Sequence, residues 1–285
     1  MTIPTDAPAQ YPQLFEVERE RLLVMLQGLD ENDWRRDTCC PGWNILDIAT
    51  HIVGGDLGIL ARHRDQHFGT EPPPGTDEAS FIAWLDTLQT EWVQAARRMS
   101  PRLTIDLLRW TGPQIERLFD EEDSTATNAM VSWASSRRVP AWLNQARELS
   151  EWWIHRQQIR EALRQPSDLR ADLARPVLDG LKWAYPKGLS KSDASNGADV
   201  EIRLTGPEVT LRWRLVREDG SWKFSERPSG PPDAFLTLST DQAWRLLTNN
   251  LHDTQTAEFG SGDGALLNSL LNCRAIIGEP KNGNT

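Results

Sequence analysis

The spacing of apolar residues changes once along this chain of 285 residues, and that change constrains the fold most strongly. Up to Pro166, apolar residues recur at spacings of three and four, which is the period of an amphipathic helix. From Val200 onward they alternate with polar residues, as in strands with one buried face. We therefore predict an α+β protein with a helical domain over residues 1–166 and a smaller α+β domain over residues 167–285.

The helical half contains five candidate segments. Helices are predicted within residues 11–29, 44–68, 78–100, 101–120 and 141–166, and the fourth is expected to break into shorter helices around Gly112-Pro113. The first segment carries its helical periodicity on Leu14, Val17, Arg21, Val24 and Met25, with Leu22 and Leu29 alongside. The second has an isoleucine stripe of Ile45, Ile48, Ile52 and Ile59, and Asn44 can cap its first turn.

The second half begins with a helical piece, "LARPVLDGLKWAYPKGL", and continues into strands. The strand segments are "VEIRLT", "VTLRWRLV", "SWKFSE" and "AFLTLST", and Asp219-Gly220 marks a hairpin turn between the second and third. Two amphipathic helices, "DQAWRLLTNNL" and "GALLNSLLNC", complete the half. This mixture predicts a small sheet covered by helices.

Charge and cysteine usage exclude several classes of protein. The net charge of -10 disfavours non-specific binding to nucleic acid or to an anionic membrane. No window approaches the length of a membrane span, and the N-terminus lacks the features of a secretion signal, so we expect a cytoplasmic protein. Three cysteines are too few for a disulfide framework, and Cys39-Cys40 is expected to lie half-buried beside a turn.

The last helix of the first half places a carboxylate and an imidazole one turn apart. Glu151 and His155 share a stripe with Ile159, so both are expected at the edge of the bundle core or inside it. A charge there is costly unless it is paired or bound to a metal. One interpretation is an internal Glu–His hydrogen bond or a solvated helix face.

His51 on the second helix supports a different interpretation. It lies just before Gly54-Gly55, where other groups can approach closely. Together with Glu151 and His155 it forms a set of three ligands, and two imidazoles with a carboxylate and an open fourth position suit catalytic zinc. Such sites are commonly built from facing helices of a bundle.

Neighbouring residues have two possible roles each. Asp47 could accept a hydrogen bond from a ligand histidine, or could stabilise the first turn of its helix. Trp43 could fill the core or contact a bound thiol or substrate. His63 and His67 are expected on a solvated helix surface.

Two motifs carry a resemblance to a known family. The segment "WRRDTCCPGWNILDIATHIVGGDLGILARHR" resembles the signature of the mycothiol-dependent maleylpyruvate isomerase N-terminal domain, and "ARELSEWWIHRQQIREAL" resembles the family's second signature. The second half is similar to the sterol-carrier-like C-terminal domain of these proteins. The resemblance implies a DinB-like four-helix bundle that holds a divalent metal, usually zinc, on His51, Glu151 and His155. It also implies mycothiol as the thiol cosubstrate.

The sequence departs from the family after the helix that ends in "LL". Isomerase-like members have an arginine there that would hold a substrate carboxylate, whereas this chain has Asn249 and Asn250. Arg245, one turn earlier, could substitute or could form a surface salt bridge. We retain Trp43 and Arg245 as candidate residues for binding the thiol or the substrate.

These observations predict a metal- and thiol-dependent isomerase or S-transferase that acts on a small electrophilic substrate. Two alternatives remain: a non-catalytic metal-containing binding or regulatory protein, and a zinc hydrolase in which Glu148 would be the general base. The expected partners are small molecules, with no nucleic acid and no membrane. The chain is expected to be a monomer or a homodimer.

Overall fold

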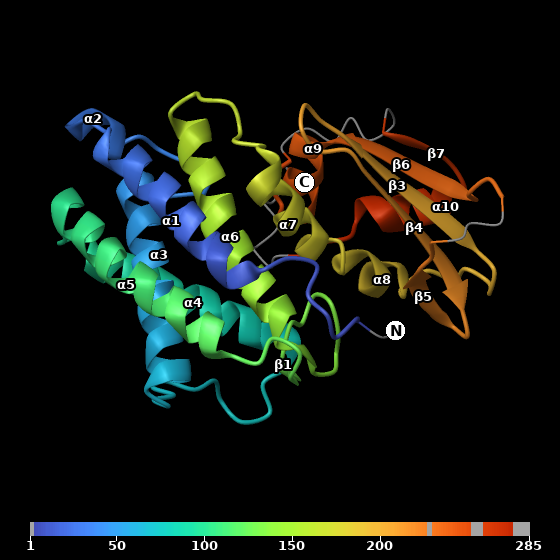
Figure 1. The fold of residues 1–285 in the computed structure, drawn as a ribbon, viewed down its shortest axis with the longest axis horizontal. Helices are drawn as coiled ribbons and strands as arrows, with labels where there is room; N and C mark the ends of the chain where they lie inside the picture. Colours follow the sequence, from blue (N-terminus) through green and yellow to red (C-terminus); the bar gives the residue numbers. More distant parts are fainter. Residues whose placement is uncertain (1–2, 227–229, 252–258, 276–285) are drawn as a thin grey trace. The chain divides into compact units, whose positions relative to one another are not determined.

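The computed structural model describes residues 3–226, 230–251 and 259–275 (Figure 1). Two compact units share the chain. The helical unit comprises residues 10–123 and 148–167, and the sheet unit comprises residues 1–9, 124–147 and 168–285. The predicted α+β class is confirmed, while the division after residue 166 stays a prediction about independently folding domains.

The helical unit is a four-helix bundle with additions. Its elements are α1 (Tyr11–Gln27), α2 (Glu31–Trp34), α3 (Ile45–Ile59), the π-helical turn η1 (Leu60–Arg64), α4 (Glu78–Ala96), α5 (Pro101–Glu121) and most of α6 (Ala141–Ala162). Helix α5 packs against α1 and α3, and α4 packs beside α3. Helix α6 closes the bundle, where Phe15 of α1 meets Trp152 edge-on with ring centroids 4.9 Å apart. The predicted isoleucine stripe of α3 is confirmed, because all four residues are buried.

Helix α1 buries a different face from the one its apolar periodicity suggested. Its buried residues are Tyr11, Phe15, Glu18, Arg19, Leu22 and Leu26, whereas Val24 is 64% exposed. The buried charges are paired across the bundle. Arg156 Nε donates to Glu18 Oε1 at 2.6 Å, and Arg19 Nη2 donates to Asp56 Oδ2 at 2.6 Å. A count of apolar residues cannot anticipate such pairs, because each partner lies on another helix.

Helix α5 is continuous, so the predicted break at Gly112-Pro113 is wrong. Proline inside a helix removes one backbone hydrogen bond and costs about 3 kcal/mol. The helix persists because it packs against the neighbouring helices, burying Leu108, Ile115 and Phe119. At Gly112 the absent side chain leaves room for Arg19, whose Cγ lies 2.9 Å from the position a Cβ would occupy.

The sheet unit contains a five-stranded sheet and a two-stranded one. Its elements are β1 (Thr127–Ala129), β2 (Val139–Pro140), α7 (Ala171–Leu181), α8 (Ala184–Leu189), β3 (Asp199–Thr205), β4 (Leu211–Glu218), β5 (Ser221–Phe224), β6 (Ala234–Ser239), α9 (Thr240–Leu247), β7 (Gly260–Gly262) and α10 (Gly264–Leu271). The strand order is β5-β4-β3-β6-β7, with β3 and β6 parallel. The predicted hairpin is confirmed, since Asp219 and Gly220 have φ values of 50° and 75° between β4 and β5.

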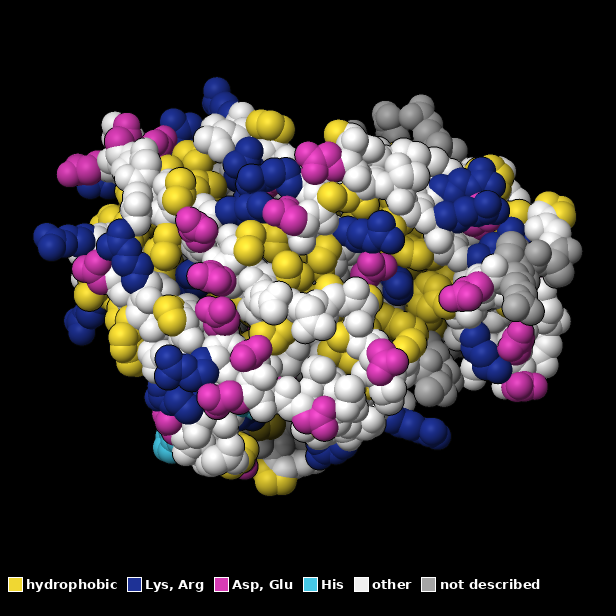
Figure 2. Space-filling model, in the orientation of Figure 1, with side chains coloured by type: hydrophobic (Ala, Val, Ile, Leu, Met, Phe, Trp, Pro, Cys, Tyr) yellow, Lys and Arg dark blue, Asp and Glu magenta, His cyan; other side chains and the backbone are white. Residues whose placement is uncertain are grey.

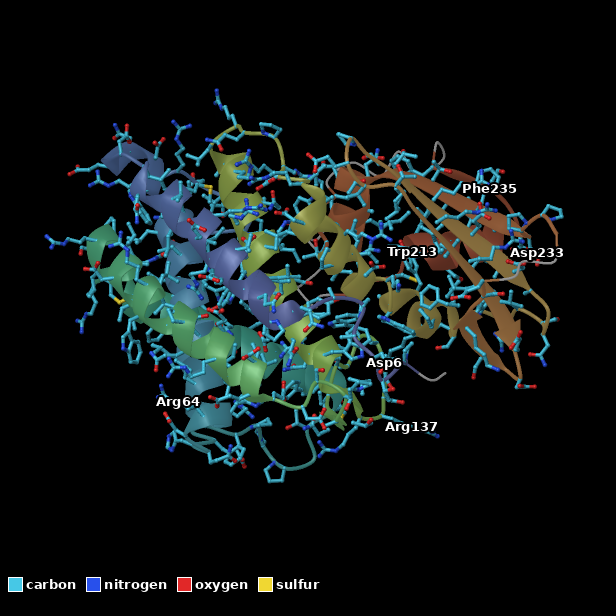
Figure 3. All side chains as sticks on the ribbon, in the orientation of Figure 1. Asp6, Arg64, Arg137, Trp213, Asp233 and Phe235 are labelled. Atoms are coloured by element: carbon cyan, nitrogen blue, oxygen red, sulfur yellow. The ribbon has the colours of Figure 1, made fainter. Side chains whose placement is uncertain are left out.

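The two faces of the five-stranded sheet differ in chemistry. Trp213 shares the apolar face with Ile202 and Leu236, its neighbours in register, and helices α8 to α10 cover strands of this sheet. Phe235 lies on the opposite face, where Arg203 stacks on its ring (Figure 3). On this second face Glu201 is buried beneath Arg203, Arg212 and Arg214.

On the face shown in Figure 2, acidic and basic side chains are interspersed among apolar ones. Within the described part of the chain, every helix is too short or too polar to cross a membrane.

Candidate functional site

A tight turn brings the sequence "TCCPGW" to one end of α3. Trp43 N donates to Cys40 O at 3.0 Å across Pro41-Gly42, and Gly42 has a φ of 75°, which a type II turn requires. Thr38 Oγ1 donates to Trp43 O at 2.8 Å and accepts from Cys40 N at 3.2 Å. These bonds hold the Cys40 and Trp43 side chains in fixed positions. Both cysteines are half-buried beside the turn, as predicted.

The first turn of α3 is fixed by a capping box. Asn44 Oδ1 accepts from Asp47 N at 3.0 Å, and Asp47 Oδ2 accepts from Asn44 N at 3.1 Å. Arg97, which follows the last residue of α4, also donates to both carboxylate oxygens of Asp47, each at 3.0 Å. Of the two roles open to Asp47, these contacts support stabilisation of the helix start.

Helix α4 holds the next turn of α3, which carries His51. Trp92 Nε1 donates to the carbonyl oxygen of Thr50 at 2.8 Å. Its indole lies against Gly54, where any Cβ would overlap the ring. Gln89, three residues before Trp92, hydrogen-bonds to His51. The glycine beside His51 therefore admits a tryptophan of the neighbouring helix.

The structure brings His51 of α3 and His155 of α6 together. Their ring centroids are 4.7 Å apart at an interplanar angle of 77°, and the Trp43 ring lies 5.0 Å from that of His51. His155 Nε2 lies 3.6 Å from Glu151 Oε2. The other ring nitrogen of His155, Nδ1, lies 2.7 Å from Gln158 Oε1.

Burial keeps both imidazoles neutral. It lowers the pKa of His51 to about 3, with a further lowering from nearby His155, while the bond to Gln89 acts in the opposite direction. Burial also lowers the pKa of His155, and Gln158 opposes that change. Each ring keeps one buried nitrogen without a hydrogen-bond partner, Nδ1 in His51 and Nε2 in His155.

The chain matches the model of one known protein family. The family model of the mycothiol maleylpyruvate isomerase N-terminal domain matches residues 15–160. The chain belongs to this family. No curated protein matches the chain.

Two solved structures of one enzyme have a fold similar to that of this chain. A crystal structure of the mycothiol-dependent maleylpyruvate isomerase has a TM-score of 0.50 at 14% identity, over 89% of this chain and 93% of that one. A histidine-to-alanine mutant of the same enzyme has a TM-score of 0.50 at 14% identity, over 86% of this chain and 90% of that one. At this identity the likeness concerns the fold.

The metal implied by the family resemblance can be tested against these side chains. Among the described residues, no group of three or more His, Cys, Asp or Glu side chains is already arranged as a metal site. The donor chemistry nevertheless fits, because two buried ring nitrogens lack partners and the Glu151 carboxylate lies beside one of them. Neutral imidazoles and a carboxylate are the ligands of many catalytic zinc sites.

Arg245 and Glu148 were also predicted to act in the reaction. Arg245 is on α9 of the sheet unit, where its Nε donates to Asp241 Oδ2 at 2.8 Å and its guanidinium stacks on Trp244. Its predicted contact with thiol or substrate stays a prediction. Burial raises the pKa of the Asp56 carboxyl, and Glu148 lies close enough to Asp56 to raise it further.

Asn249 and Asn250, at the position where an arginine was expected, are part of local structure. Asn249 has a φ of 57°, and its Oδ1 accepts from Arg274 Nε at 2.6 Å. Asn250 is buried, and its amide donates to the hydroxyl and the carbonyl of Thr248, each at 2.8 Å.

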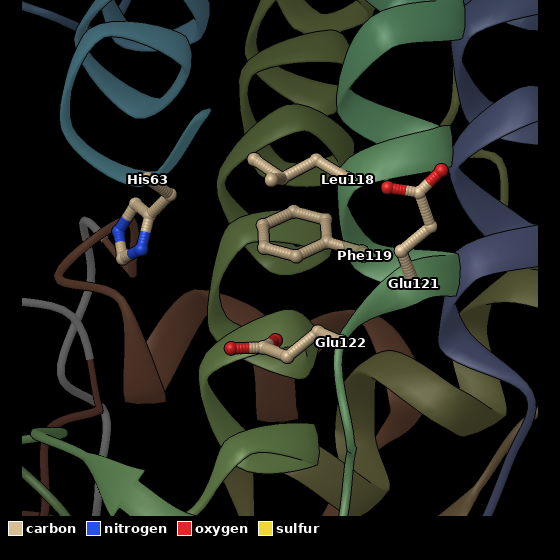
Figure 4. A pocket seen from close by; sticks show the side chains of 5 residues that line it. All are labelled: His63, Leu118, Phe119, Glu121 and Glu122. Atoms are coloured by element: carbon tan, nitrogen blue, oxygen red, sulfur yellow. The ribbon is translucent and has the colours of Figure 1, made fainter. Parts of the chain in front are cut away.

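A surface pocket lies at the far end of α3 and α5. It has a volume of about 250 Å³ and is lined by His63, Leu118, Phe119, Glu121 and Glu122 (Figure 4). His63 follows His51 by twelve residues, which corresponds to about 18 Å along a helix. The pocket contains none of the predicted site residues. His63 is exposed, as predicted.

Sequence reasoning did not assign roles to the residues that contact the two histidines. Gln158 bonds to His155 and Gln89 bonds to His51. Cys40 in turn bonds to Gln158, and Trp92 bonds to the backbone of Thr50 beside His51. The spacing of three between His155 and Gln158 was a usable signal, because such residues are neighbours on a helix. The others come from distant segments and had no local signal.

Proposed function

We propose that the protein is a metal-dependent enzyme that uses a low-molecular-weight thiol, mycothiol by family, as an isomerase or S-transferase. The observation that carries the proposal is the pair of adjacent, half-buried imidazoles, each with one buried nitrogen that lacks a partner. Buried polar atoms in native proteins usually have partners, so two such nitrogens side by side support the proposal that both bind one ligand. A cytoplasmic location is part of the same proposal.

In this proposal His51, Glu151 and His155 hold the metal. A bound divalent ion such as zinc would lower the pKa of a thiol enough to give a thiolate at neutral pH. The chain's own residues prepare the site. Burial keeps the imidazoles neutral and able to donate lone pairs, and the Trp43 ring covers one side of His51.

The reaction uses an electrophilic double bond. The thiol sulfur adds to one carbon, which turns the double bond into a single bond that can rotate. In isomerisation the same carbon–sulfur bond then breaks and the thiol is regenerated. In S-transfer that bond stays, and the other carbon of the former double bond takes up the proton that the thiol lost. Asn249 and Asn250 carry no charge where the family arginine would bind a carboxylate, so we propose an electrophile other than maleylpyruvate. Trp43 and Arg245 are the proposed contacts for thiol and substrate.

The decisive experiment measures metal content by elemental mass spectrometry. We expect about one zinc per chain in the wild type and a loss of metal in His155→Ala, because two ligands hold zinc poorly. The control is His63→Ala, which removes an exposed histidine outside the site. A folded wild type that takes up no metal when zinc is supplied would overturn the proposal and favour an internal Glu151–His155 pair.

A second experiment separates the reaction classes. Calorimetric titration of the zinc-loaded protein with mycothiol should show binding, with a weaker signal for His155→Ala. Turnover of activated esters without a thiol would instead favour the hydrolase, with Glu148 as the base. Metal binding without thiol binding or turnover would favour the non-catalytic alternative.

A further inference from the structure

We propose that Gln158 is a positioning residue that fixes the ring of His155, and that the Cys40 thiol fixes Gln158. The inference rests on the proposed function, because it concerns how the chain prepares His155 to hold a metal. It adds two residues, from two distant segments, that act through the histidine without touching the metal.

The contacts converge on one oxygen atom. Gln158 Oε1 lies 2.7 Å from His155 Nδ1, and Cys40 Sγ donates to the same Oε1 at 3.4 Å. Gln158 is only 5% exposed, so solvent does not compete for its amide. The two partners reach the oxygen from α6 itself and from the turn before α3.

The chemistry of the amide decides the tautomer. A neutral imidazole has one N–H donor and one acceptor nitrogen, and an amide oxygen only accepts. His155 Nδ1 must therefore carry the proton, and the lone pair is left on Nε2. This is the buried nitrogen that has no partner and lies beside Glu151.

The thiol selects the orientation of the amide. A flipped Gln158 would present its NH₂ group to Nδ1, which would move the lone pair to Nδ1 and the proton to Nε2. Cys40 favours the oxygen at this place because its S–H is a donor and its sulfur is a weak acceptor. The turn that fixes Cys40 holds this donor in position.

The experiment compares paired variants by two readouts that do not depend on turnover. These are the Zn²⁺ dissociation constant, from competition with a chromophoric chelator, and the visible absorption of the Co²⁺-loaded protein. Gln158→Leu should weaken Zn²⁺ binding about 10- to 100-fold and alter the Co²⁺ spectrum. Gln158→Glu keeps an acceptor oxygen and should restore both.

The cysteine pair tests the second link. Cys40→Ala should weaken Zn²⁺ binding by a smaller factor, about 2- to 10-fold, as expected for the loss of one weak hydrogen bond. Cys40→Ser keeps a donor and should bind as the wild type does. Gln157→Leu is the control, since Gln157 is buried on the same helix and donates to Trp153 O.

The outcomes separate the two proposals. A wild type that binds no Zn²⁺ overturns the proposed function. A wild type that binds Zn²⁺, with unchanged affinity and Co²⁺ spectrum in Gln158→Leu, overturns the positioning role alone. If thermal unfolding shows that Gln158→Leu does not fold, the cysteine pair decides, and equal affinities of Cys40→Ala and Cys40→Ser overturn the inference.

Discussion

His155 and Arg156 are neighbours on α6, and both side chains are largely buried. They differ in whether all of their polar atoms have partners within the protein. Arg156 forms a closed pair with Glu18 of α1, with Nε–Oε1 and Nη2–Oε2 distances of 2.6 and 2.8 Å. His155 has a partner for Nδ1 and none for Nε2. The closed pair joins two helices, whereas the open nitrogen is available to a ligand.

Burial alone therefore does not tell whether a polar residue contributes to stability or to ligand binding. Removing one member of a buried ion pair leaves an uncompensated charge and costs several kcal/mol. A buried polar nitrogen that has no hydrogen-bond partner already destabilises the folded protein, because it has lost its bonds to water. Replacing that imidazole by an apolar side chain removes this penalty. Arg156 should therefore matter for stability, and His155 for ligand binding.

The largest expected effect breaks the closed pair. Glu18→Ala leaves the Arg156 guanidinium buried without its carboxylate, which should lower the free energy of unfolding by about 3–5 kcal/mol. Urea denaturation measures the loss. Glu20→Ala, an exposed position on the same helix, should change it by less than about 0.5 kcal/mol. Equal effects of the two substitutions would contradict the structural role of the pair.

A smaller effect is expected where α4 meets the helix of His51. Gly54→Ala places a Cβ inside the Trp92 indole ring and should cost about 1–3 kcal/mol of stability through overpacking. Gly55→Ala is the matched control, because nothing lies within 4 Å of its Cβ position. It should stabilise the helix by about 0.5–1 kcal/mol. Thermal unfolding should thus shift in opposite directions for adjacent glycines.

In the sheet unit, Glu201 is a buried carboxylate paired with arginines, and its pairs should make stability depend on pH. Burial by itself raises the pKa of Glu201, but hydrogen bonds from Arg212 and Arg203 outweigh it, so the pKa lies below its ordinary value. Glu201 therefore takes up a proton more readily in the unfolded chain than in the folded one. Its ion pairs stabilise the folded protein fully above about pH 4.5, and this contribution is lost as the pH falls through the lowered pKa.

Glu201→Gln should flatten that acid dependence and cost on the order of 1 kcal/mol near neutral pH, because two of the arginines are exposed and screened. Denaturation midpoints at several pH values between neutral and acid test it. Glu218→Gln is the control, since its partner Lys223 is exposed. A pH profile identical to that of the wild type would show that Glu201 contributes no such stabilisation.

The smallest effect on the free energy of unfolding is expected at His155, whose Nε2 has no hydrogen-bond partner. In protein freed of metal by a chelator, His155→Leu should change the free energy of unfolding by less than about 1 kcal/mol, because an apolar side chain of similar size fills the site. The same denaturation series used for Glu18→Ala measures it. A loss of about 3 kcal/mol would mean that His155 and Glu151 form a structural pair.

Local patterns were predicted well where one segment contained all the information. The isoleucine stripe of α3 and the Asp219-Gly220 hairpin follow from spacing and turn chemistry within a few residues. The buried face of α1 and the continuity of α5 did not, because Glu18, Arg19 and Gly112 take their environment from other helices.

The sequence by itself determined the α+β class, the family, and the placement of a carboxylate and an imidazole on one turn of a helix. These properties depend on residues close in the chain. Only the tertiary structure decided which nitrogen of each histidine lacks a partner, because Cys40 meets Gln158 across 118 positions and Gln89 of α4 bonds to His51 from another helix. A hydrogen bond depends on distance in space, and spacing in sequence fixes that distance only within a helix or a turn.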